Sequence, residues 1–310
     1  MPPAIDHGAL QRVVAIINGK GGVGKTTLTA NVGGLLALGG WRVLLADLDF
    51  QGDLGRDLGY HGTDNDDDGR GLSKALQFTD DAPRILRDVR PGLDVITGGS
   101  AVEGAAAALS AKAARSGSHV AHLSVAEMLT HVANDYDIIL LDCPPSNEVI
   151  QSAAVAAARY VVIPTRTDKA GIDGLASTAS RFDGVIDLNP DLDLLGVIIF
   201  DSGASATSVR ASAARDITAR LGVDNAEDLI FTGYVRHAEA VARASRDRGL
   251  LVHELDDAFK AAPRWYERAR LGWQGSVPPE SSTGIADSLQ AITNELTDRI
   301  MAKEAEVANV

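Results

Sequence analysis

The sequence lacks several features that mark particular classes of protein. It has one cysteine, Cys143, in 310 residues, which excludes an internal disulfide framework and a thiolate-rich metal site within one chain. We interpret Cys143 as a small buried hydrophobic residue. No stretch reaches the roughly 18 uncharged apolar residues of a membrane helix, and residues 1–12 have no apolar signal core. The chain is therefore predicted to be cytoplasmic, with no membrane partner.

Basic charge is scarce over most of the chain. The formal net charge is −13, which argues against a protein that coats nucleic acid with its whole surface. Between Ser205 and Arg270, however, 11 Lys/Arg stand against 10 Asp/Glu. Two interpretations of this less acidic third stay open, namely a local basic face and an ordinary solvated helix surface.

Short apolar, β-branched runs alternate along the chain with helix-length amphipathic segments. Because the apolar runs are continuous, the strands should be buried on both faces, as in a parallel sheet with crossover helices. The alternation predicts an α/β fold with a mostly parallel central sheet flanked by helices. The predicted strands are Val13–Ile17, Val43–Ala46, Leu93–Thr97, Ile138–Leu141, Tyr160–Ile163 and Leu194–Phe200, and the predicted helices are Thr26–Leu38, Ala101–Ala114, Val120–Asn134, Glu148–Ala158, Ile172–Asp187, Ser208–Leu221, His237–Arg248 and Ile285–Lys303.

We expect a single domain over residues 1–310, with residues 1–11 as an N-terminal tail and residues 272–284 as a linker before a C-terminal helix at 285–303. The aspartate-rich segment 60–71 has no apolar periodicity, which predicts a mobile surface loop. Segment 264–273 mixes arginines with aromatics. It either contacts DNA or a partner protein, or forms an amphipathic helix packed on the sheet.

A phosphate-binding motif lies between the first predicted strand and the first predicted helix. Residues 19–27 read Gly-Lys-Gly-Gly-Val-Gly-Lys-Thr-Thr and match the P-loop pattern. Glycines let backbone N–H groups approach phosphate oxygens, and the following helix adds its positive end. Lys25 can reach the β- and γ-phosphates, and the Thr26 hydroxyl can ligate Mg²⁺. The predicted nucleotide-binding residues here are Gly19, Lys20, Gly21, Gly22, Val23, Gly24, Lys25, Thr26 and Thr27.

Carboxylates follow two further predicted strands. Asp47 and Asp49 end the apolar run 43–49, and Asp142 ends the run 136–142. Ligands of open α/β sheets collect at the carboxyl ends of the strands, so these acids should lie near the P-loop. Mg²⁺ keeps much of its hydration and is held by few protein carboxylates. We therefore predict Thr26, Asp47 and Asp142 as the metal site.

These residues together resemble the lysine-doubled, or deviant, Walker A ATPases, the ParA/MinD family of P-loop proteins, and within it the ParA/Soj-type partition ATPases. Lys20 is the discriminating mark, because a second lysine directly after the first glycine is the family's signature. The resemblance implies that Lys20 reaches across an ATP-sandwich homodimer to the partner's nucleotide. It also implies that Asp49 handles the attacking water, so that Lys20, Lys25 and Asp49 are the predicted catalytic residues.

Other segments extend the resemblance over roughly residues 12–255. Segment 142–146, Asp-Cys-Pro-Pro-Ser, is similar to the family's D-x-P-P-S switch, and Pro164 with Gly174-Leu175 is similar to a stretch near its dimer interface. Phe50 departs from the family, which has proline there. The strand that ends at Phe200 and Asp201 resembles the one bordering the adenine, so these two residues are candidate base contacts.

The resemblance implies slow intrinsic ATP hydrolysis with Mg²⁺, non-specific DNA binding by the ATP dimer, nucleoid association, and a ParB-like partner that stimulates hydrolysis. The candidate DNA-binding residues are Arg210, Arg236, Arg243, Arg246 and Arg248. Two alternatives stay open. One is a MinD-like or other cargo-positioning ATPase, although the acidic tail argues against attachment to anionic lipid. The other is a metabolic P-loop enzyme such as an ATP-dependent ligase.

Overall fold

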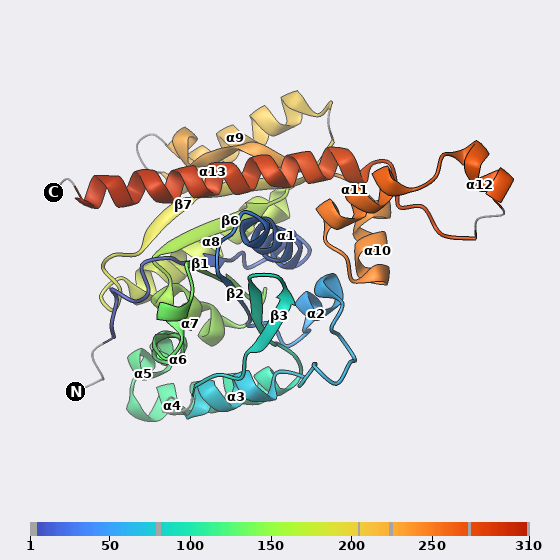
Figure 1. The fold of residues 1–310 in the computed structure, drawn as a ribbon. Coiled ribbons are helices and arrows are strands. Elements are labelled where there is room, and N and C mark those ends of the chain that lie inside the picture. The colour runs from blue at the N-terminus through green and yellow to red at the C-terminus, as the bar shows by residue number, and fades with distance from the viewer. Residues whose placement is uncertain (1–4, 79–81, 204, 223–225, 272–273, 309–310) are drawn as a thin grey trace.

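A computed structural model of the chain describes residues 5–78, 82–203, 205–222, 226–271 and 274–308. Its strands form one eight-stranded sheet in the order β3-β4-β2-β5-β1-β6-β7-β8 (Figure 1). β3 pairs with β4 in antiparallel fashion, and the other neighbouring strands are parallel. The predicted mostly parallel sheet is confirmed. The strands are β1 (Val13–Ile16), β2 (Val43–Asp47), β3 (Leu86–Arg90), β4 (Leu93–Ile96), β5 (Ile138–Asp142), β6 (Tyr160–Thr165), β7 (Asp193–Ser202) and β8 (Ile230–Arg236).

Helices cover both faces of the sheet, because side chains along each central strand alternate between two buried clusters. Val14, Ile16, Leu45 and Leu140 pack toward α1, α11 and α13, whereas the residues between them pack toward the opposite helices. The helices are α1 (Lys25–Leu38), α2 (Asp53–Leu58), α3 (Arg70–Gln77), α4 (Ala101–Ser116), α5 (Ser118–His122), α6 (Ser124–Thr130), η1 (Ala133–Asp135), α7 (Glu148–Ala157), α8 (Lys169–Val185), α9 (Thr207–Leu221), η2 (Ala226–Leu229), α10 (Glu239–Arg248), α11 (Val252–Ala261), α12 (Trp265–Leu271) and α13 (Ser282–Ala308).

The structure differs from the sequence prediction in several elements. The predicted helix Val120–Asn134 is divided into α5, α6 and η1, with breaks at Leu123 and His131. Strands β3 and β8 and helices α2, α3 and α11 were not predicted. The last helix begins at Ser282, inside the segment expected to be a linker.

Helix α13 runs across one face of the sheet (Figure 1). Ile285, Leu289, Ile292, Leu296 and Ile300 are buried and form one stripe at helical spacing. Near the C-terminal end of α13, the guanidinium of Arg12 forms a two-bond ion pair with Glu304, at 2.6 and 2.8 Å. No helix among the described residues is long and apolar enough to cross a bilayer.

Candidate nucleotide site

The P-loop forms an open turn between β1 and α1 at the carboxyl edge of the sheet. Gly22 and Gly24 have φ of +73° and +87°, a left-handed conformation that favours glycine. Lys25 is buried, and its Nζ donates to the carbonyl oxygen of Lys20 at 3.1 Å. Burial lowers the pKa of Lys25, and the nearby Asp142, Cys143 and Asp49 oppose that shift. The Lys20 side chain, in contrast, is exposed.

A buried asparagine, which the sequence prediction missed, fixes the start of this loop. The Asn18 side chain accepts from Lys20 N at 2.8 Å and donates to Pro164 O at 2.9 Å, so it ties the loop to the end of β6. A Cβ at Gly174 would lie 1.9 Å from Asn18 Oδ1. The Pro164 and Gly174 stretch therefore holds the P-loop from the side of α8.

Phe200 packs against the P-loop. A Cβ built at Gly24 would lie 2.3 Å from the Phe200 ring, so the ring occupies the space above this glycine. The adjacent Asp201 has a left-handed φ of 61° and forms ion pairs with Arg166, at 2.5 Å, and with His237. Phe200 thus lies beside the P-loop, and the Arg166 guanidinium and the His237 ring hold the Asp201 carboxylate.

Two buried carboxylates stand side by side next to Lys25. Asp47 of β2 and Asp142 of β5 are register partners in the parallel sheet. Asp47 Oδ1 accepts from Asp49 N at 3.0 Å, while Asp47 Oδ2 and both oxygens of Asp142 have no hydrogen-bond partner among the described residues. Buried polar atoms are rarely left without partners in folded proteins.

Burial sets the protonation of this acid pair. It raises the pKa of Asp47 well above its usual range, and the Asp142 charge adds to the effect. Burial also raises the pKa of Asp142 to about 7, although the nearby Thr26 side chain and Lys25 lower it. Partnerless carboxylate oxygens beside a threonine hydroxyl are a set of oxygen ligands that suits Mg²⁺. Thr26, Asp47 and Asp142, the three predicted metal-site residues, are thus brought together.

Asp49, the acid predicted to handle the attacking water, is buried near Lys25. It is 8% exposed, and burial raises its pKa while the Gln51 N–H and Lys25 lower it. Asp49 Oδ1 accepts from Gln51 N at 3.0 Å, and the Asp49 carbonyl accepts from Gly52 and Gly99. These bonds hold the loop with Phe50 in the position of the family proline.

Asp57 is a second residue that the sequence prediction missed. This buried acid of α2 lies 3.2 Å from Arg246 Nε of α10 and accepts from Thr27 Oγ1 at 3.4 Å. Burial raises its pKa, and Arg246 lowers it. The P-loop motif does not predict this contact, because Arg246 is 189 positions from Asp57 in the sequence.

Three of the five candidate DNA-binding arginines are engaged within the protein. Arg246 pairs with Asp57 as described above. Arg210 donates to Gly203 O at 2.6 Å and lies 3.8 Å from the centre of the Tyr234 ring. Arg248 donates to Ser276 Oγ at 2.8 Å. These side chains hold α9, α10 and the segment before α13 in place.

The remaining two arginines are more available. Arg243 is 83% exposed, with an ion pair to Asp247 at 3.5 Å. Such an exposed pair on one helix contributes little to stability and breaks readily. Arg236 is exposed at the end of β8, beside Gly284. Both lie near the carboxyl edge of the sheet, where β8 ends and α10 follows.

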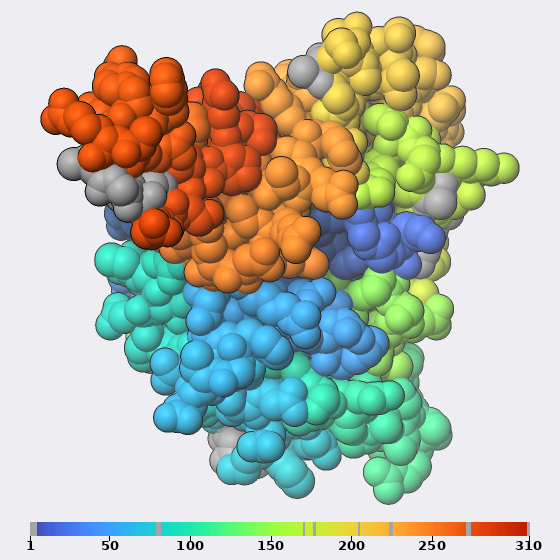
Figure 2. Space-filling model, turned by 90° about the vertical axis from the view of Figure 1, so that its right-hand side faces the viewer, coloured from blue at the N-terminus to red at the C-terminus, as the bar shows by residue number. Residues whose placement is uncertain are grey.

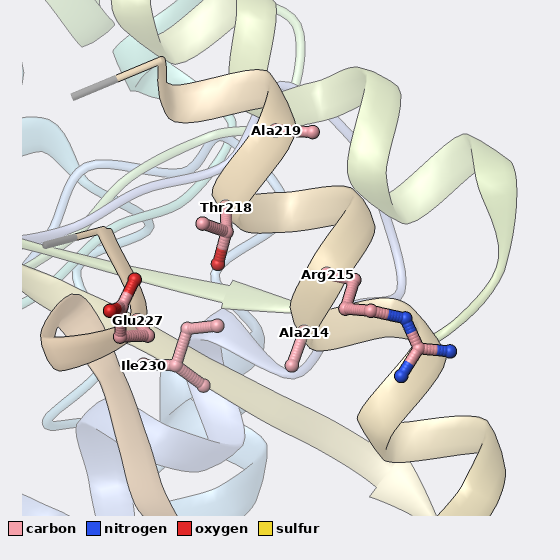
Figure 3. A pocket seen from close by; sticks show the side chains of 6 residues that line it. All are labelled: Ala214, Arg215, Thr218, Ala219, Glu227 and Ile230. Atoms are coloured by element: carbon pink, nitrogen blue, oxygen red, sulfur yellow. The ribbon is translucent and has the colours of Figure 1, made fainter. Parts of the chain in front are cut away.

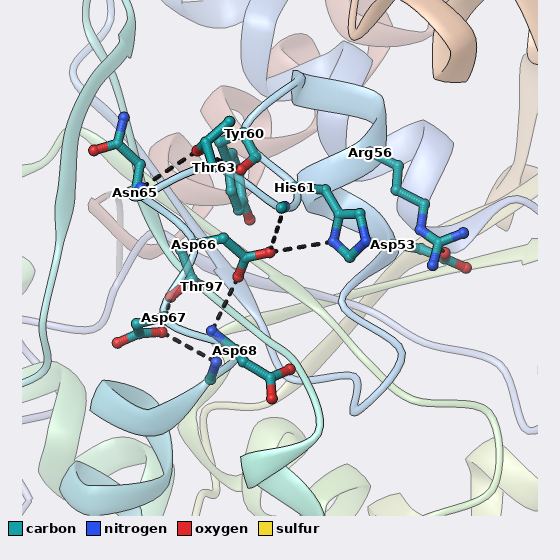
Figure 4. Close-up of polar contacts among 12 residues, drawn as sticks. Asp53, Arg56, Tyr60, His61, Thr63, Asn65, Asp66, Asp67, Asp68 and Thr97 are labelled. Atoms are coloured by element: carbon teal, nitrogen blue, oxygen red, sulfur yellow. Dashed lines mark hydrogen bonds and ion pairs between the residues drawn. The ribbon is translucent and has the colours of Figure 1, made fainter.

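The aspartate-rich segment 60–71 is tied to its surroundings (Figure 4). Asp66 accepts from Gly62 N and Asp68 N, and Asp67 accepts from Gly69 N, all at 3.0 Å. Asp67 also accepts from Thr97 Oγ1 at 2.5 Å. Its carboxylates therefore order the turn that leads into α3.

A separate groove lies between α9 and the start of β8 (Figure 3). Ala214, Arg215, Thr218, Glu227 and Ile230 line it together with a further alanine of α9. β8 is the edge strand, and β6 and β7 separate it from β1, which leads into the P-loop. The groove is thus distinct from the nucleotide site.

Comparison with known proteins identifies the family of this chain. A family described as an AAA domain matches residues 11–194. The chromosome partitioning protein ParA of Caulobacter vibrioides is 35% identical over 259 residues, which cover 81% of this chain and 90% of that protein. The chain belongs to the ParA/Soj family of P-loop ATPases. The predicted family and the ATPase class are confirmed.

Solved structures agree with this ParA-family fold. The structure of apo McdA from Cyanothece superposes with a TM-score of 0.68 at 20% identity, covering 93% of this chain and 99% of that one. Cobyrinic acid a,c-diamide synthase from Mycobacterium smegmatis, solved with an ATP analogue and magnesium, gives a TM-score of 0.62 at 27% identity, covering 86% and 98%. At 20% identity, the likeness to McdA shows only that the two chains share a fold.

Proposed function

We propose that this chain is a partition-type ATPase in which two copies enclose two ATP–Mg²⁺ and bind DNA without sequence preference. The observation that carries the proposal is the contrast between the two P-loop lysines. Lys25 is buried against its own loop, whereas Lys20 is exposed at the same edge. Lys20 is thus free to serve a nucleotide held by a second copy.

The chain's own residues can perform the hydrolytic steps. The glycine-rich turn and Lys25 would hold the phosphates, and Thr26, Asp47 and Asp142 would hold Mg²⁺, which would neutralise charge on the phosphates. Asp49, fixed through one oxygen by Gln51 N, keeps its other oxygen for orienting water. Contacts to the γ-phosphate would order the dimer, and their loss after hydrolysis would release it.

DNA binding is assigned to the edge that carries Arg236 and Arg243. Both are exposed, and non-specific binding requires basic side chains that reach phosphates. A ParB-like protein would stimulate hydrolysis and reset the cycle, and the ATP-bound dimer would associate with the nucleoid. A membrane-attached positioner is less favoured because the apolar stripe of α13 is packed on the sheet.

The test is binding of random-sequence duplex DNA with ATP–Mg²⁺, ADP–Mg²⁺ or no nucleotide, at two salt concentrations. We expect salt-sensitive binding with ATP alone. Arg243→Ala should reduce the slope of log affinity against log salt by about 0.9 per lost phosphate contact. Arg215→Ala, on α9, is the matched control with no expected change. Absence of DNA binding in every state would favour a protein-cargo positioner or a metabolic enzyme.

A further inference from the structure

Helix α12 belongs to an arm that projects from the molecule, and Arg248 of α10 holds the returning segment of this arm through Ser276. We define the α12 arm as residues 262–271 and 274–281, between α11 and α13. In Figure 1 it projects to the right, beyond α10 and α11. The sequence prediction left open whether this segment packs on the sheet, and the structure places it away from the sheet.

The arm exposes two neighbouring aromatic side chains. Trp265 is 74% exposed and Tyr266 is 49% exposed, and their rings meet edge to face at 6.0 Å between centroids. Aromatic side chains each bury roughly 150–250 Å² when covered, so an adjacent exposed pair is a strong candidate for an interface anchor. The arm therefore has an apolar tip that nothing in the described part of the chain covers.

The arm lies on the same face as the nucleotide site. Figure 2 views the molecule from the right of Figure 1 and shows α12 at the upper left, with α10 and α11 between it and the blue segment that includes the P-loop. Residues 20–22 of the P-loop are exposed. In the proposed ATP sandwich a second copy stacks on this face, so an element projecting past the face extends alongside that copy.

We infer that the α12 arm docks on a second copy of this chain, with Trp265 and Tyr266 as anchors and its arginines against acidic surface. Between residues 264 and 271, Arg264, Arg268 and Arg270 stand against Glu267, whereas the whole chain carries −13. A second copy therefore offers charge opposite to that of the arm. The inference rests on the proposed sandwich dimer.

Aromatic exposure favours a protein surface over DNA as the occupant. Base stacking on aromatic side chains is the binding mode of single strands with unstacked bases, while the bases of a duplex are already stacked. Tryptophan and tyrosine instead gain from an apolar patch on a protein. Arginine alone would have sufficed for phosphate contacts.

The experiment compares dimerisation of the full chain by sedimentation velocity with a non-hydrolysable ATP analogue and Mg²⁺. The arm variant is Trp265→Ala/Tyr266→Ala, and the matched control is Phe78→Ala, an aromatic that is 61% exposed at the C-cap of α3. We expect the arm variant to weaken the dimer about tenfold or more, since 1.4 kcal/mol corresponds to tenfold. The control should leave it unchanged. A thermal melt of each monomer verifies folding.

A crosslink identifies the occupant directly. Cys143 is fully buried, so Tyr266→Cys introduces the one accessible thiol for a photoreactive label. We expect crosslinked dimer with the ATP analogue and little with ADP. Label transfer to duplex DNA, together with unchanged dimerisation of the arm variant, would overturn the inference and assign the arm to DNA.

The outcomes separate the inference from the proposed function. If the wild-type chain remains monomeric with the analogue, the sandwich and the arm contact both fail. If the wild type dimerises and the arm variant dimerises equally well, the arm contact alone is wrong. If the arm variant dimerises weakly while both monomers melt alike, the inference holds.

Discussion

Arg246 of α10 and Asp57 of α2 form an ion pair at 3.2 Å in which the carboxylate is buried and the guanidinium is half exposed. Asp57 also accepts a hydrogen bond from the hydroxyl of Thr27, the last residue of the P-loop motif. The pair therefore connects the start of α1 to the helix that carries the exposed Arg243.

Arg246→Ala should destabilise the chain by about 2 kcal/mol, less than the 3–5 kcal/mol of a fully buried pair because Arg246 is half exposed. Arg243→Ala, on the same helix, is the control and should change stability little. Burial already raises the pKa of Asp57, and losing Arg246 raises it further. The unpaired Asp57 carboxylate destabilises the fold most when it is ionised, which is above its pKa. The loss of stability should therefore shrink as pH falls toward 4. Urea unfolding at pH 4 and pH 8 measures this, and equal losses would contradict it.

Asp49→Asn should reduce ATP turnover by about 10²–10⁴-fold, because it removes the carboxylate that we propose orients the attacking water. ATP binding and ATP-dependent dimerisation should persist, since the phosphate cradle is intact. Lys25→Ala should instead abolish nucleotide binding. Phosphate release and binding of a fluorescent ATP analogue report the two effects separately. Turnover of Asp49→Asn at the wild-type rate would reject the assignment of this acid.

ATP and Mg²⁺ binding at pH 7 should release protons from the acid pair. The pKa of Asp142 is about 7 in the ligand-free fold against 3.8 for an ordinary aspartate, so part of the population holds a proton there. A bound cation favours the ionised form. Calorimetry in two buffers of different ionisation enthalpy should give different heats, and Asp142→Asn should reduce the difference. Identical heats for the wild type would disprove the proton release.

The same shift fixes the sign of a pH effect on stability. Between pH 4 and 7 the folded chain retains a proton at Asp142 that the unfolded chain has lost, so this group makes stability fall as pH rises through that window. In Asp142→Asn the decline should be smaller. Thermal melts of the nucleotide-free protein across the window provide the measurement.

Gly24→Ala should be more damaging than Gly22→Ala. Both glycines have a left-handed φ, which costs an alanine about 1–2 kcal/mol, and no atom lies within 4 Å of a Cβ at Gly22. A Cβ at Gly24 would also clash with Phe200, adding about 1–3 kcal/mol. Denaturant unfolding without nucleotide should show the difference, and Phe200→Ala should recover part of it in the double variant. Equal losses at the two glycines would refute the Phe200 contact.

Sequence patterns predicted the central strands well because their residues are apolar on both faces. β3 and β8 were missed because they are edge strands with partly exposed, polar residues such as Arg87 and Thr232. Helix α11 did carry a signal, since Val252, Leu255 and Phe259 follow helical spacing and Glu254 in the first turn accepts a capping bond from Leu251 N.

The P-loop and its acids could be predicted because each lies at the end of a recognisable strand. Asn18 and Asp57 could not be predicted, because their roles depend on Pro164 and Arg246, which are 146 and 189 positions away. The availability of arginines was likewise invisible in the sequence. Arg210 and Arg243 both lie on helices, yet one is stacked on Tyr234 and the other is exposed.

The ion pair between Arg12 and Glu304 brings the beginning and the end of the described chain to the same side of the sheet (Figure 1). This side is opposite the edge that carries the P-loop, because β1 runs from Arg12 toward Gly19. Fluorescent reporters or surface tethers attached beside Arg12 or Glu304 would therefore lie on the side of the sheet away from the P-loop. Live imaging and single-molecule immobilisation could use these positions without covering the nucleotide site.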